Sequence, residues 1–525
     1  MAVARVACRA QVGLHAPLVQ VEVSLASGLP AFCIVGLPAT VVKESKERVR
    51  AALLNSRFEF PAGRITVSLA PAELPKEGGR FDLPIALGIL LASGQVRAEA
   101  RTAGAVATRE FYGELGLTGE LMPVRGLLLA AAHARRQGHE LIVPHQNAAE
   151  VCAVAPVQVR TAGHLLEVCA YLSGSAPLAP CRAQLRPPGS SPARPSPHDA
   201  VDLADVRGQV HAKRALIVAA AGSHSLLLIG PPGSGKSMLA RRLPGLLPPL
   251  AEGEALEVAA IAAVSTAGFV PERFGERPFR APHHTASAAA LVGGGGRARP
   301  GEISLAHQGV LFLDELPEFA RPVLEALREP LETGVVAVSR AALQAQYPAA
   351  FQLIAAMNPC PCGRLGDPAG GCHCTPAEVQ GYRGRISCPL LDRLDMHVEV
   401  PRVSAREFAD VERAGETTAV AAARVARARA VQLDRQGTSN ARLGDGGVER
   451  WCAPDAVGRR LLESAMERLG LSGRARQRVL KVARTIADLE GAATLSATHI
   501  GEAVMLRCMD RCATAPSAPC DRRPA

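Results

Sequence analysis

Aromatic residues are scarce in this sequence: they make up 3% of its 525 residues, with one Trp and four Tyr. Proteins that bind single-stranded nucleic acid usually stack the bases on such side chains. If this chain binds nucleic acid, we expect contacts to the backbone instead. The net charge of +10 favours a polyanionic partner, although many basic proteins carry only a solvated positive surface.

Long apolar runs are also missing. No run reaches the roughly 20 residues that span a bilayer, and the N-terminus lacks the apolar block of a signal peptide. We therefore expect a cytoplasmic protein with no membrane contact. Most of the 14 cysteines are then reduced, so the close pairs Cys360/Cys362 and Cys372/Cys374 suggest metal binding before they suggest disulfides.

The length exceeds that of a usual single domain and predicts several packed units. Pro, Gly and Ser crowd residues 174–200, which we interpret as a linker without regular structure. Before the linker, residues 1–173 are predicted to form an α/β domain. Its clearest predicted elements are strands at 64–70 and 140–144 and helices at 41–54 and 83–93.

After the linker, residues 201–404 contain short apolar runs typical of buried parallel strands, separated by helical patterns. These runs are 226–229, 310–313 and 353–356. The pattern then turns helical, so residues 405–512 are predicted to form a helical lid and residues 513–525 a disordered tail. The clearest predicted lid helices are 411–432 and 475–489.

A phosphate-binding motif follows the first of these apolar runs. Residues 230–237 read GPPGSGKS, which matches G-x-x-x-x-G-K-S between a strand and a helix. Backbone N–H groups would surround a β-phosphate, Lys236 would reach the β/γ oxygens, and Ser237 would hold Mg²⁺. The predicted nucleotide-binding residues are Gly230, Pro231, Pro232, Gly233, Ser234, Gly235, Lys236 and Ser237.

Two carboxylates end the second apolar run, which reads VLFLDE at 310–315. We expect Asp314 to orient Mg²⁺ through its water shell and Glu315 to polarise the attacking water. Asn358 ends the third run and is predicted to lie beside the γ-phosphate as a polar sensor. Without the phosphate-binding motif, a solvated or helix-capping role would be the better interpretation of the carboxylates.

Further candidates are less specific. Arg393, in LLDRLD, is a candidate arginine finger, and Arg474 is a candidate lid sensor, but spacing alone leaves a surface salt bridge equally open for each. His283 and His284 are candidate metal ligands, although adjacent histidines usually point apart and capping or packing is the preferred interpretation.

The sequence resembles the YifB/ComM-type family of magnesium-chelatase-like AAA+ ATPases along nearly its whole length. The similar stretches are 36–38, 43–51, 68–90, 280–284, 299–318, 357–363, 390–400 and 482–489. The resemblance implies an ATP- and Mg²⁺-dependent hexameric ring, in which Arg393 reaches a neighbour's ATP and Arg474 is the lid sensor. It also makes the loop with Arg297 and Arg299, and the hairpin around residues 335–340 with Arg340 near its turn, candidate pore elements that contact DNA. A solvated basic loop is the alternative.

The N-terminal domain resembles the Lon-protease fold without its catalytic dyad. Arg80-Phe81-Asp82 stands where that fold has its serine, and Leu128 aligns with its lysine, so neither nucleophile nor base remains. The expected fold class is therefore α/β, with a Lon-protease-like N-terminal α/β domain, an AAA+ P-loop α/β domain and a C-terminal helical lid. Proteolysis is not expected.

The cysteine pairs lie in the loop CPCGRLGDPAGGCHC. Four thiolates from Cys360, Cys362, Cys372 and Cys374 suit a tetrahedral structural Zn²⁺. A reduced loop with free thiols, or ligation that includes His373, stays open because the spacing with one intervening residue is unusual for zinc knuckles.

The resemblance favours a DNA motor: a helicase or branch-migration ATPase that acts in recombination of incoming DNA during natural transformation. A magnesium-chelatase-like metal-insertion subunit is the first alternative, and the extra N-terminal domain argues against it. A protein remodeller is the second, and the missing dyad and the scarcity of aromatic residues argue against it.

Overall fold

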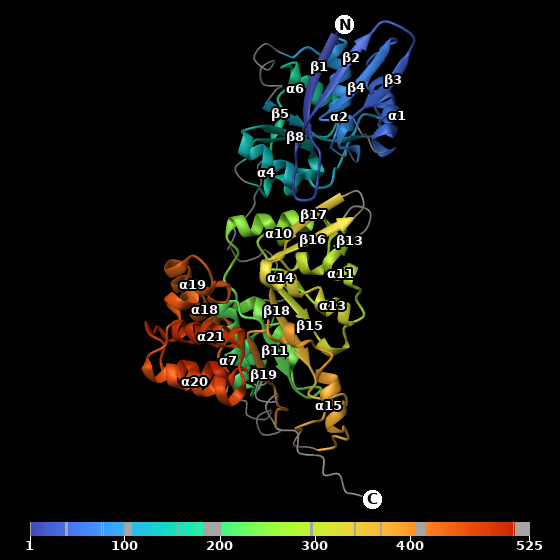
Figure 1. Ribbon diagram of the computed structural model, residues 1–525. Helices are drawn as coiled ribbons and strands as arrows, with labels where there is room; N and C mark the ends of the chain where they lie inside the picture. Colours follow the sequence, from blue (N-terminus) through green and yellow to red (C-terminus); the bar gives the residue numbers. More distant parts are fainter. Residues whose placement is uncertain are drawn as a thin grey trace, which may run out of the picture. The chain divides into compact units, whose positions relative to one another are not determined.

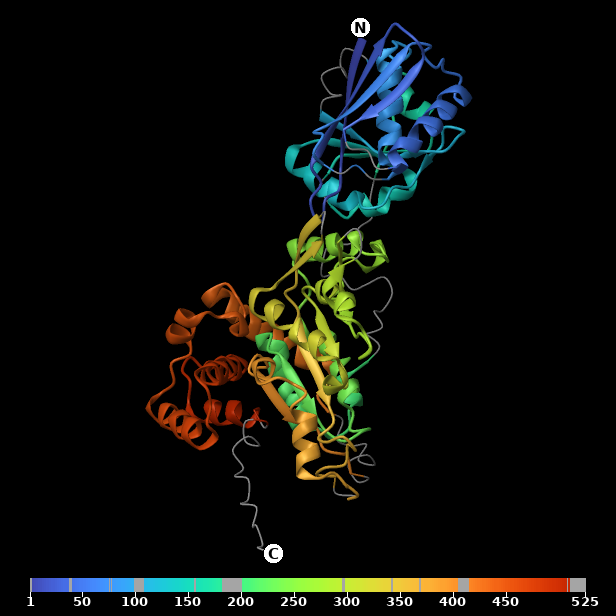
Figure 2. The ribbon, with the colours of Figure 1, turned by 45° about the vertical axis from the view of Figure 1, so that its right-hand side comes forward.

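The structure is a computed structural model that describes residues 2–36, 40–74, 76, 78–98, 108–154, 157–181, 201–294, 298–340, 343–367, 370–404, 415–507 and 509. The chain forms two compact units (Figure 1, Figure 2). Unit 1 consists of Met1–Ser190 and Ala251–Gly275, and unit 2 of Ser191–Leu250 and Glu276–Ala525. The predicted tail and most of the predicted linker lie outside the described residues.

Unit 1 is built on an eight-stranded sheet in the order β10-β9-β8-β5-β1-β2-β4-β3. Antiparallel pairing joins β1, β2 and β4, whereas β1, β5, β8 and β9 pair in parallel. The strands of this sheet are β1 (Ala2–Arg9), β2 (Leu18–Ala26), β3 (Ala31–Val35), β4 (Arg64–Ala70), β5 (Arg109–Phe111), β8 (Glu140–Pro144), β9 (Val159–Ala162) and β10 (Ala179–Pro180). The predicted strands at 64–70 and 140–144 are confirmed as β4 and β8.

The helices of unit 1 from its N-terminal segment are α1 (Thr40–Asn55), α2 (Asp82–Ala92), α4 (Leu127–Gln137), α5 (Ala148–Cys152) and α6 (Leu165–Leu172). Helix α2 is apolar on all sides, which is typical of a helix inside a core, and all but one of its residues are buried. Gly88 allows close packing on β2, because a Cβ at this position would lie 2.4 Å from Cγ2 of Val23. The predicted helices 41–54 and 83–93 match α1 and α2 to within one residue at each end.

The residues that stand in place of the Lon-type serine and lysine contribute to the packing of unit 1. Arg80 donates hydrogen bonds to the Arg125 carbonyl at 2.8 Å and to Gln11 Oε1 at 3.1 Å. The buried Asp82 carboxylate pairs with Arg48 at 2.7 Å, and Leu128 is buried in α4. These side chains are used to hold unit 1 together.

Two features of unit 1 differ from the expectation. Residues 179–180, within the predicted linker, form the edge strand β10, where Pro180 is tolerated because an edge strand leaves backbone groups unpaired. Cys152 and Cys181 form a disulfide that was not predicted, although most of the described cysteines are free, as the sequence predicts. Nine other described cysteines are free.

A helix from the middle of the chain completes unit 1. Helix α10 (Glu252–Val264) lies within residues that the sequence analysis counts in the ATPase core, yet Ala251–Gly275 groups with unit 1. Ala259 belongs to the buried core of that unit, and Leu256, Ala260, Phe269 and Phe274 pack against it. Arg135 of α4 also pairs with Glu252 at 3.3 Å.

Unit 2 contains a parallel five-stranded sheet in the order β12-β15-β18-β11-β19. Its strands are β11 (Leu226–Ile229), β12 (Phe279–Arg280), β15 (Val310–Leu313), β18 (Gln352–Met357) and β19 (Met396–Glu399). The three predicted strands are therefore confirmed, and all are buried. Because the strands are parallel, the residues that follow β11, β15 and β18 meet at one edge of the sheet.

Short helices and two hairpins surround this sheet. The helices are α7 (Val210–Gly222), α8 (Lys236–Ala240), α9 (Leu243–Leu246), α11 (Ala288–Val292), α12 (Glu302–Leu305), α13 (Arg321–Glu325), α14 (Arg328–Thr333), α15 (Pro376–Arg383) and α16 (Cys388–Leu391). The hairpins pair β13 (Gly293–Gly294) with β14 (Arg299–Pro300), and β16 (Val335–Arg340) with β17 (Leu343–Pro348).

The C-terminal part of unit 2 is helical, as predicted, and is drawn in orange and red in Figure 1. It contains α18 (Thr418–Gln436), α19 (Asp445–Trp451), α20 (Ala456–Leu469), α21 (Gly473–Glu490) and α22 (Ala497–Met505). Its side chains share one core with α7 and β11, for example Val425 and Val479 with Leu216 and Leu228.

The first of these helices begins later than the predicted residue 411. Residues 415–417 are not helical, and the extended Thr417 caps α18 by accepting a hydrogen bond from the Val420 N–H at 3.4 Å. Across the part of the chain that the structure describes, no helix combines the length and apolar character needed to cross a membrane.

Candidate nucleotide-binding site

The phosphate-binding loop connects β11 to α8. Gly233 and Gly235 have φ values of 76° and 91°, which favour glycine. Gly230 lies so close to β19 that a Cβ would be 2.1 Å from the Val400 carbonyl oxygen. The glycines of the motif therefore permit both the left-handed turns and the close backbone approach that a phosphate cradle needs.

Lys236 points into this loop. Its Nζ donates hydrogen bonds to the Gly230 carbonyl at 2.7 Å, the Pro231 carbonyl at 3.0 Å and Asn358 Oδ1 at 3.2 Å. The side chain is 8% exposed, and burial lowers its pKa although Asp314 and Glu315 oppose this effect. Phosphate oxygens would replace these neutral acceptors with charged ones.

Ser237 and Asp314 are brought together across the sheet edge. Ser237 Oγ donates a hydrogen bond to Asp314 Oδ2 at 2.6 Å. A hydroxyl and a carboxylate oxygen at this separation are hard oxygen donors of the kind that Mg²⁺ prefers. The pair therefore fits the predicted Mg²⁺ position beside the phosphate loop.

Glu315 follows β15 in a strained conformation. Its φ is 54°, a value that non-glycine residues rarely adopt, and its N–H donates to Asp314 Oδ1 at 3.0 Å. The carboxylate is 53% exposed and lies 3.1 Å from Nδ1 of His284. The conformation turns the Glu315 side chain out of the strand, where a water molecule can reach it.

The partner of Glu315 was not predicted. His284 follows β12, and β12 pairs in parallel with β15, so both side chains lie at the same end of neighbouring strands. His283 instead contacts Thr285 Oγ1 at 2.9 Å, and the two imidazole rings are 4.1 Å apart. Because β12 has only two residues, it has no recognisable strand pattern.

The contacts described for the two candidate arginines, Arg393 and Arg474, do not include the residues around the phosphate-binding loop. Arg393 is 9% exposed on its side chain, pairs with Glu332 at 2.5 Å and donates to the Pro389 carbonyl at 2.7 Å. Arg474 is exposed in the first turn of α21. A third arginine, Arg478, lies one turn further along α21 and was not predicted; it forms a salt bridge with the buried Asp395.

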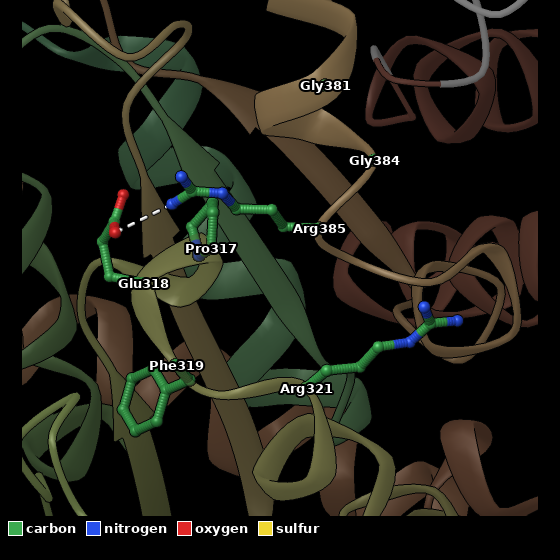
Figure 3. Close-up of a pocket in the computed structure, with 7 residues that line it drawn as sticks. All are labelled: Pro317, Glu318, Phe319, Arg321, Gly381, Gly384 and Arg385. Carbon is green, nitrogen blue, oxygen red and sulfur yellow. Dashed lines mark hydrogen bonds and ion pairs between the residues drawn. The ribbon is translucent and has the colours of Figure 1, made fainter.

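A pocket of about 460 Å³ opens beside the segment that begins two residues after Glu315. It is lined by residues that follow β15 and by the C-terminal end of α15, namely Pro317, Glu318, Phe319, Arg321, Gly381, Gly384 and Arg385. Arg385 reaches across it to Glu318 at 2.9 Å, whereas Arg321 points away from this pair (Figure 3). This ion pair links the segment after Glu315 to the segment after the cysteine loop.

The four predicted cysteines converge. Cys360 Sγ lies 3.3 Å from Cys362 Sγ and 3.8 Å from Cys372 Sγ, and all four sulfurs, including that of Cys374, lie within 4.8 Å of one another. Four ligands at the usual Zn–S distance of about 2.3 Å would place tetrahedral sulfurs about 3.8 Å apart. The cluster can therefore hold a metal ion.

The cysteine loop is joined to the nucleotide site. Cys360 is buried only two residues after Asn358, and the Leu365 N–H donates to its sulfur at 3.4 Å. Gly363 lies against the phosphate loop, because a Cβ there would be 2.7 Å from Pro232 Cδ. A change in the conformation of this loop would therefore affect both Asn358 and the phosphate-binding loop.

The structure describes the candidate DNA elements in part. Arg297 lies outside the described residues, as does the side chain of Arg340, whose backbone ends β16. Arg299 lies in β14 and is half-buried. Tyr347 of β17 donates to the Ala298 carbonyl at 2.9 Å, so the two candidate elements contact each other.

Three families match successive parts of the chain. The family described as magnesium chelatase, subunit ChlI, matches residues 202–408; subunit ChlI of Mg-chelatase matches 21–147; and its C-terminal part matches 415–507. The chain is 48% identical over 513 residues to an uncharacterized protein YifB of Salmonella typhimurium, covering 97% of this chain and 98% of the relative. Competence protein ComM of Haemophilus influenzae is 47% identical over 513 residues with the same coverage, and the uncharacterized YifB of Escherichia coli 46% identical over 519 residues, covering 97% and 98%. This chain belongs to the YifB/ComM-type magnesium-chelatase-like family.

Proposed function

We propose that this protein is an AAA+ ATPase that hydrolyses ATP at the sheet edge formed by β11, β15 and β18. The convergence of Lys236, Ser237, Asp314, Glu315 and Asn358 at this edge carries the proposal. These residues come from three separate segments, and each has a task in phosphoryl transfer.

Each task follows from chemistry and position. Lys236 would hold the β/γ oxygens, and Ser237 and Asp314 would hold Mg²⁺, which would supply positive charge against the phosphates. Glu315 orients the water that attacks the γ-phosphate. Asn358, already in contact with Lys236 at 3.2 Å, detects whether that phosphate is present.

We further propose a hexameric ring in which Arg393 reaches the ATP of a neighbouring subunit and Arg474 senses ATP from the lid. Arg393 would have to leave Glu332, to which it is bound at 2.5 Å in the single chain. The exposed position of Arg474 at the start of α21 leaves it accessible to a nucleotide.

The substrate of the motor is proposed to be DNA. One relative is named a competence protein, the net charge is +10, and Arg299 lies on a hairpin that contacts the β16–β17 hairpin. We infer a cytoplasmic helicase or branch-migration factor acting on incoming DNA during natural transformation. Unit 1 would be a Lon-like domain without protease activity.

A metal-insertion motor is the second candidate, because the matching families are described as magnesium chelatase subunits. A test that separates the two measures ATP turnover alone and with single-stranded, duplex or branched DNA, and with Mg²⁺ and a porphyrin. Stimulation by DNA supports the DNA motor, whereas stimulation by the porphyrin alone would replace it with metal insertion.

The cysteine cluster is proposed to hold a structural Zn²⁺. Its sulfur separations of 3.3–3.8 Å suit a tetrahedral thiolate site and exceed the length of any disulfide bond. The ion would fix the loop that begins two residues after Asn358.

A further inference from the structure

The start of β19 carries a buried carboxylate close to the candidate finger. Asp395 lies two residues after Arg393 and is 4% exposed. It accepts hydrogen bonds from the Ser225 N–H at 3.1 Å and contacts His224 Nδ1 at 3.3 Å. Its second oxygen pairs with Arg478 of α21.

This carboxylate is held ionised by its partners. Burial opposes ionisation, but the charge of Arg478 and the hydrogen bond to His224 outweigh it and lower the pKa of Asp395 below its ordinary value. A buried charge that depends on a specific partner strongly disfavours separation from that partner. Arg478 and the start of β19 therefore move together.

The same contacts fix the backbone of Arg393. Ser225 Oγ donates to the Arg393 carbonyl at 3.3 Å and accepts from the Asp395 N–H at 2.9 Å. Ser225 directly precedes β11, the strand that leads into the phosphate loop. The segment that carries Arg393 is thus held between β11 and α21.

Helix α21 joins this arrangement to the lid. Arg474 and Arg478 are one helical turn apart, so a shift of one carries the other with it. A second contact secures the helix, because His224 Nε2 lies 2.7 Å from Thr485 Oγ1. His224 therefore touches both Asp395 and α21.

We propose that Arg478 is a positioning residue, whose salt bridge with Asp395 couples the lid helix of one subunit to the arginine which that subunit presents to its neighbour. ATP sensed by Arg474 would thereby set the position of Arg393. The proposal rests on the roles of Arg393 and Arg474 given above.

The test compares full-length Arg478→Gln, Arg478→Lys and the control Arg476→Gln, which changes an exposed arginine of the same helix. Arg478→Gln should lower kcat at least about tenfold with KM unchanged, because an arginine finger contributes roughly 10³–10⁵ to kcat. Arg478→Lys should recover part of the loss, and Arg476→Gln should match the wild type.

Mixing subunits separates positioning from simple support. Glu315→Gln subunits keep a normal finger but cannot hydrolyse, whereas Arg478→Gln subunits keep a normal Glu315. Mixed rings should regain activity at interfaces that join the two, as should mixtures of Arg393→Ala with Glu315→Gln. Mixtures of Arg478→Gln with Arg393→Ala should gain no activity above that of the separate variants.

The outcomes are distinguishable. If Arg393→Ala complements Glu315→Gln but Arg478→Gln does not, Arg478 supports only its own site and the coupling is wrong. If Arg393→Ala also fails to complement in rings that form, the proposed finger itself is wrong. Should Arg478→Gln fail to fold, the same comparison with Arg478→Lys decides, since its residual defect must show the same pattern.

Discussion

Lys236 and Glu315 differ in their surroundings, and we expect them to serve different steps. Lys236 is buried among carbonyl oxygens of the phosphate loop, whereas the Glu315 carboxylate is half-exposed and lies 3.1 Å from His284. We predict that Lys236→Ala weakens ATP binding, while Glu315→Gln retains binding and abolishes turnover. Fluorescent-nucleotide titration and phosphate release measure both properties, and equal loss of affinity in the two variants would contradict the assignment.

At this scale the sequence predicts what depends on short contiguous motifs. Lys236 and Ser237 are found because they end a glycine-rich motif that follows an apolar run, and Asp314 and Glu315 because they directly follow another. The parallel pairing that brings the two segments to one edge follows from these apolar runs. His284 and Arg478 are missed because their partners are set by strand neighbours and helix docking. Neither relation leaves a local pattern.

Strand β19 contains a histidine that titrates unusually. Burial, and then the charge of Arg507, lowers the pKa of His397 to about 3, against about 6.5 in an unfolded chain. Between these values the unfolded chain binds a proton that the folded chain does not, so the free energy of unfolding falls as pH decreases. We predict a contribution of about 2 kcal/mol lost between pH 7 and pH 5.

Urea unfolding at the two pH values measures this contribution when the wild type is compared with His397→Leu. The variant removes the titrating group and should lose less stability at pH 5, by about the same 2 kcal/mol. An identical pH dependence of both proteins would show that folding does not lower the pKa of His397.

The cysteine loop gives a second prediction for a single element. We expect about one Zn²⁺ per chain, lost in Cys372→Ser and retained in Cys388→Ser, because Cys388 is exposed and outside the cluster. Elemental analysis of untagged protein measures the metal. Wild-type protein without zinc, or equal zinc in both variants, would remove the proposed site.

Predicted elements agree with the structure where a run of one pattern is long enough. The apolar runs of β11 and β15 and the all-apolar helix α2 are examples. The edge strand β10 is missed because its composition is that of a linker. The start of α18 is misplaced because it is set by the capping hydrogen bond of Thr417, which the helical pattern does not reveal. Edges and caps depend on single hydrogen bonds.

For the whole molecule, we predict that DNA binding depends on Arg297, Arg299 and Arg340. A triple Ala variant should keep basal ATP turnover and ring assembly, but lose stimulation by DNA. Its affinity for duplex DNA should also depend less steeply on salt, with the slope reduced by about 0.9 for each lost phosphate contact.

The matched control is Arg427→Ala, an exposed arginine of α18. The neighbouring Arg424 and Arg429 are less suitable, since Arg424 pairs with Glu416 at 3.0 Å and Arg429 donates to the Ala220 carbonyl at 2.9 Å. A normal salt slope in the triple variant together with a reduced slope in Arg427→Ala would assign DNA to α18.

Helix α10 has a consequence for how the chain can be divided. Its backbone continues from unit 2 at both ends, but Leu256, Ala260 and Phe269 belong to the apolar interior of unit 1. A C-terminal fragment that begins after the linker would keep these side chains but lose the part of unit 1 that covers them. It would therefore expose apolar area and aggregate. The complementary fragment would lack a helix of its own interior. The two units are therefore not interchangeable modules joined by one tether, and gene fusion or domain exchange at residues 182–200 would separate parts that fold as one.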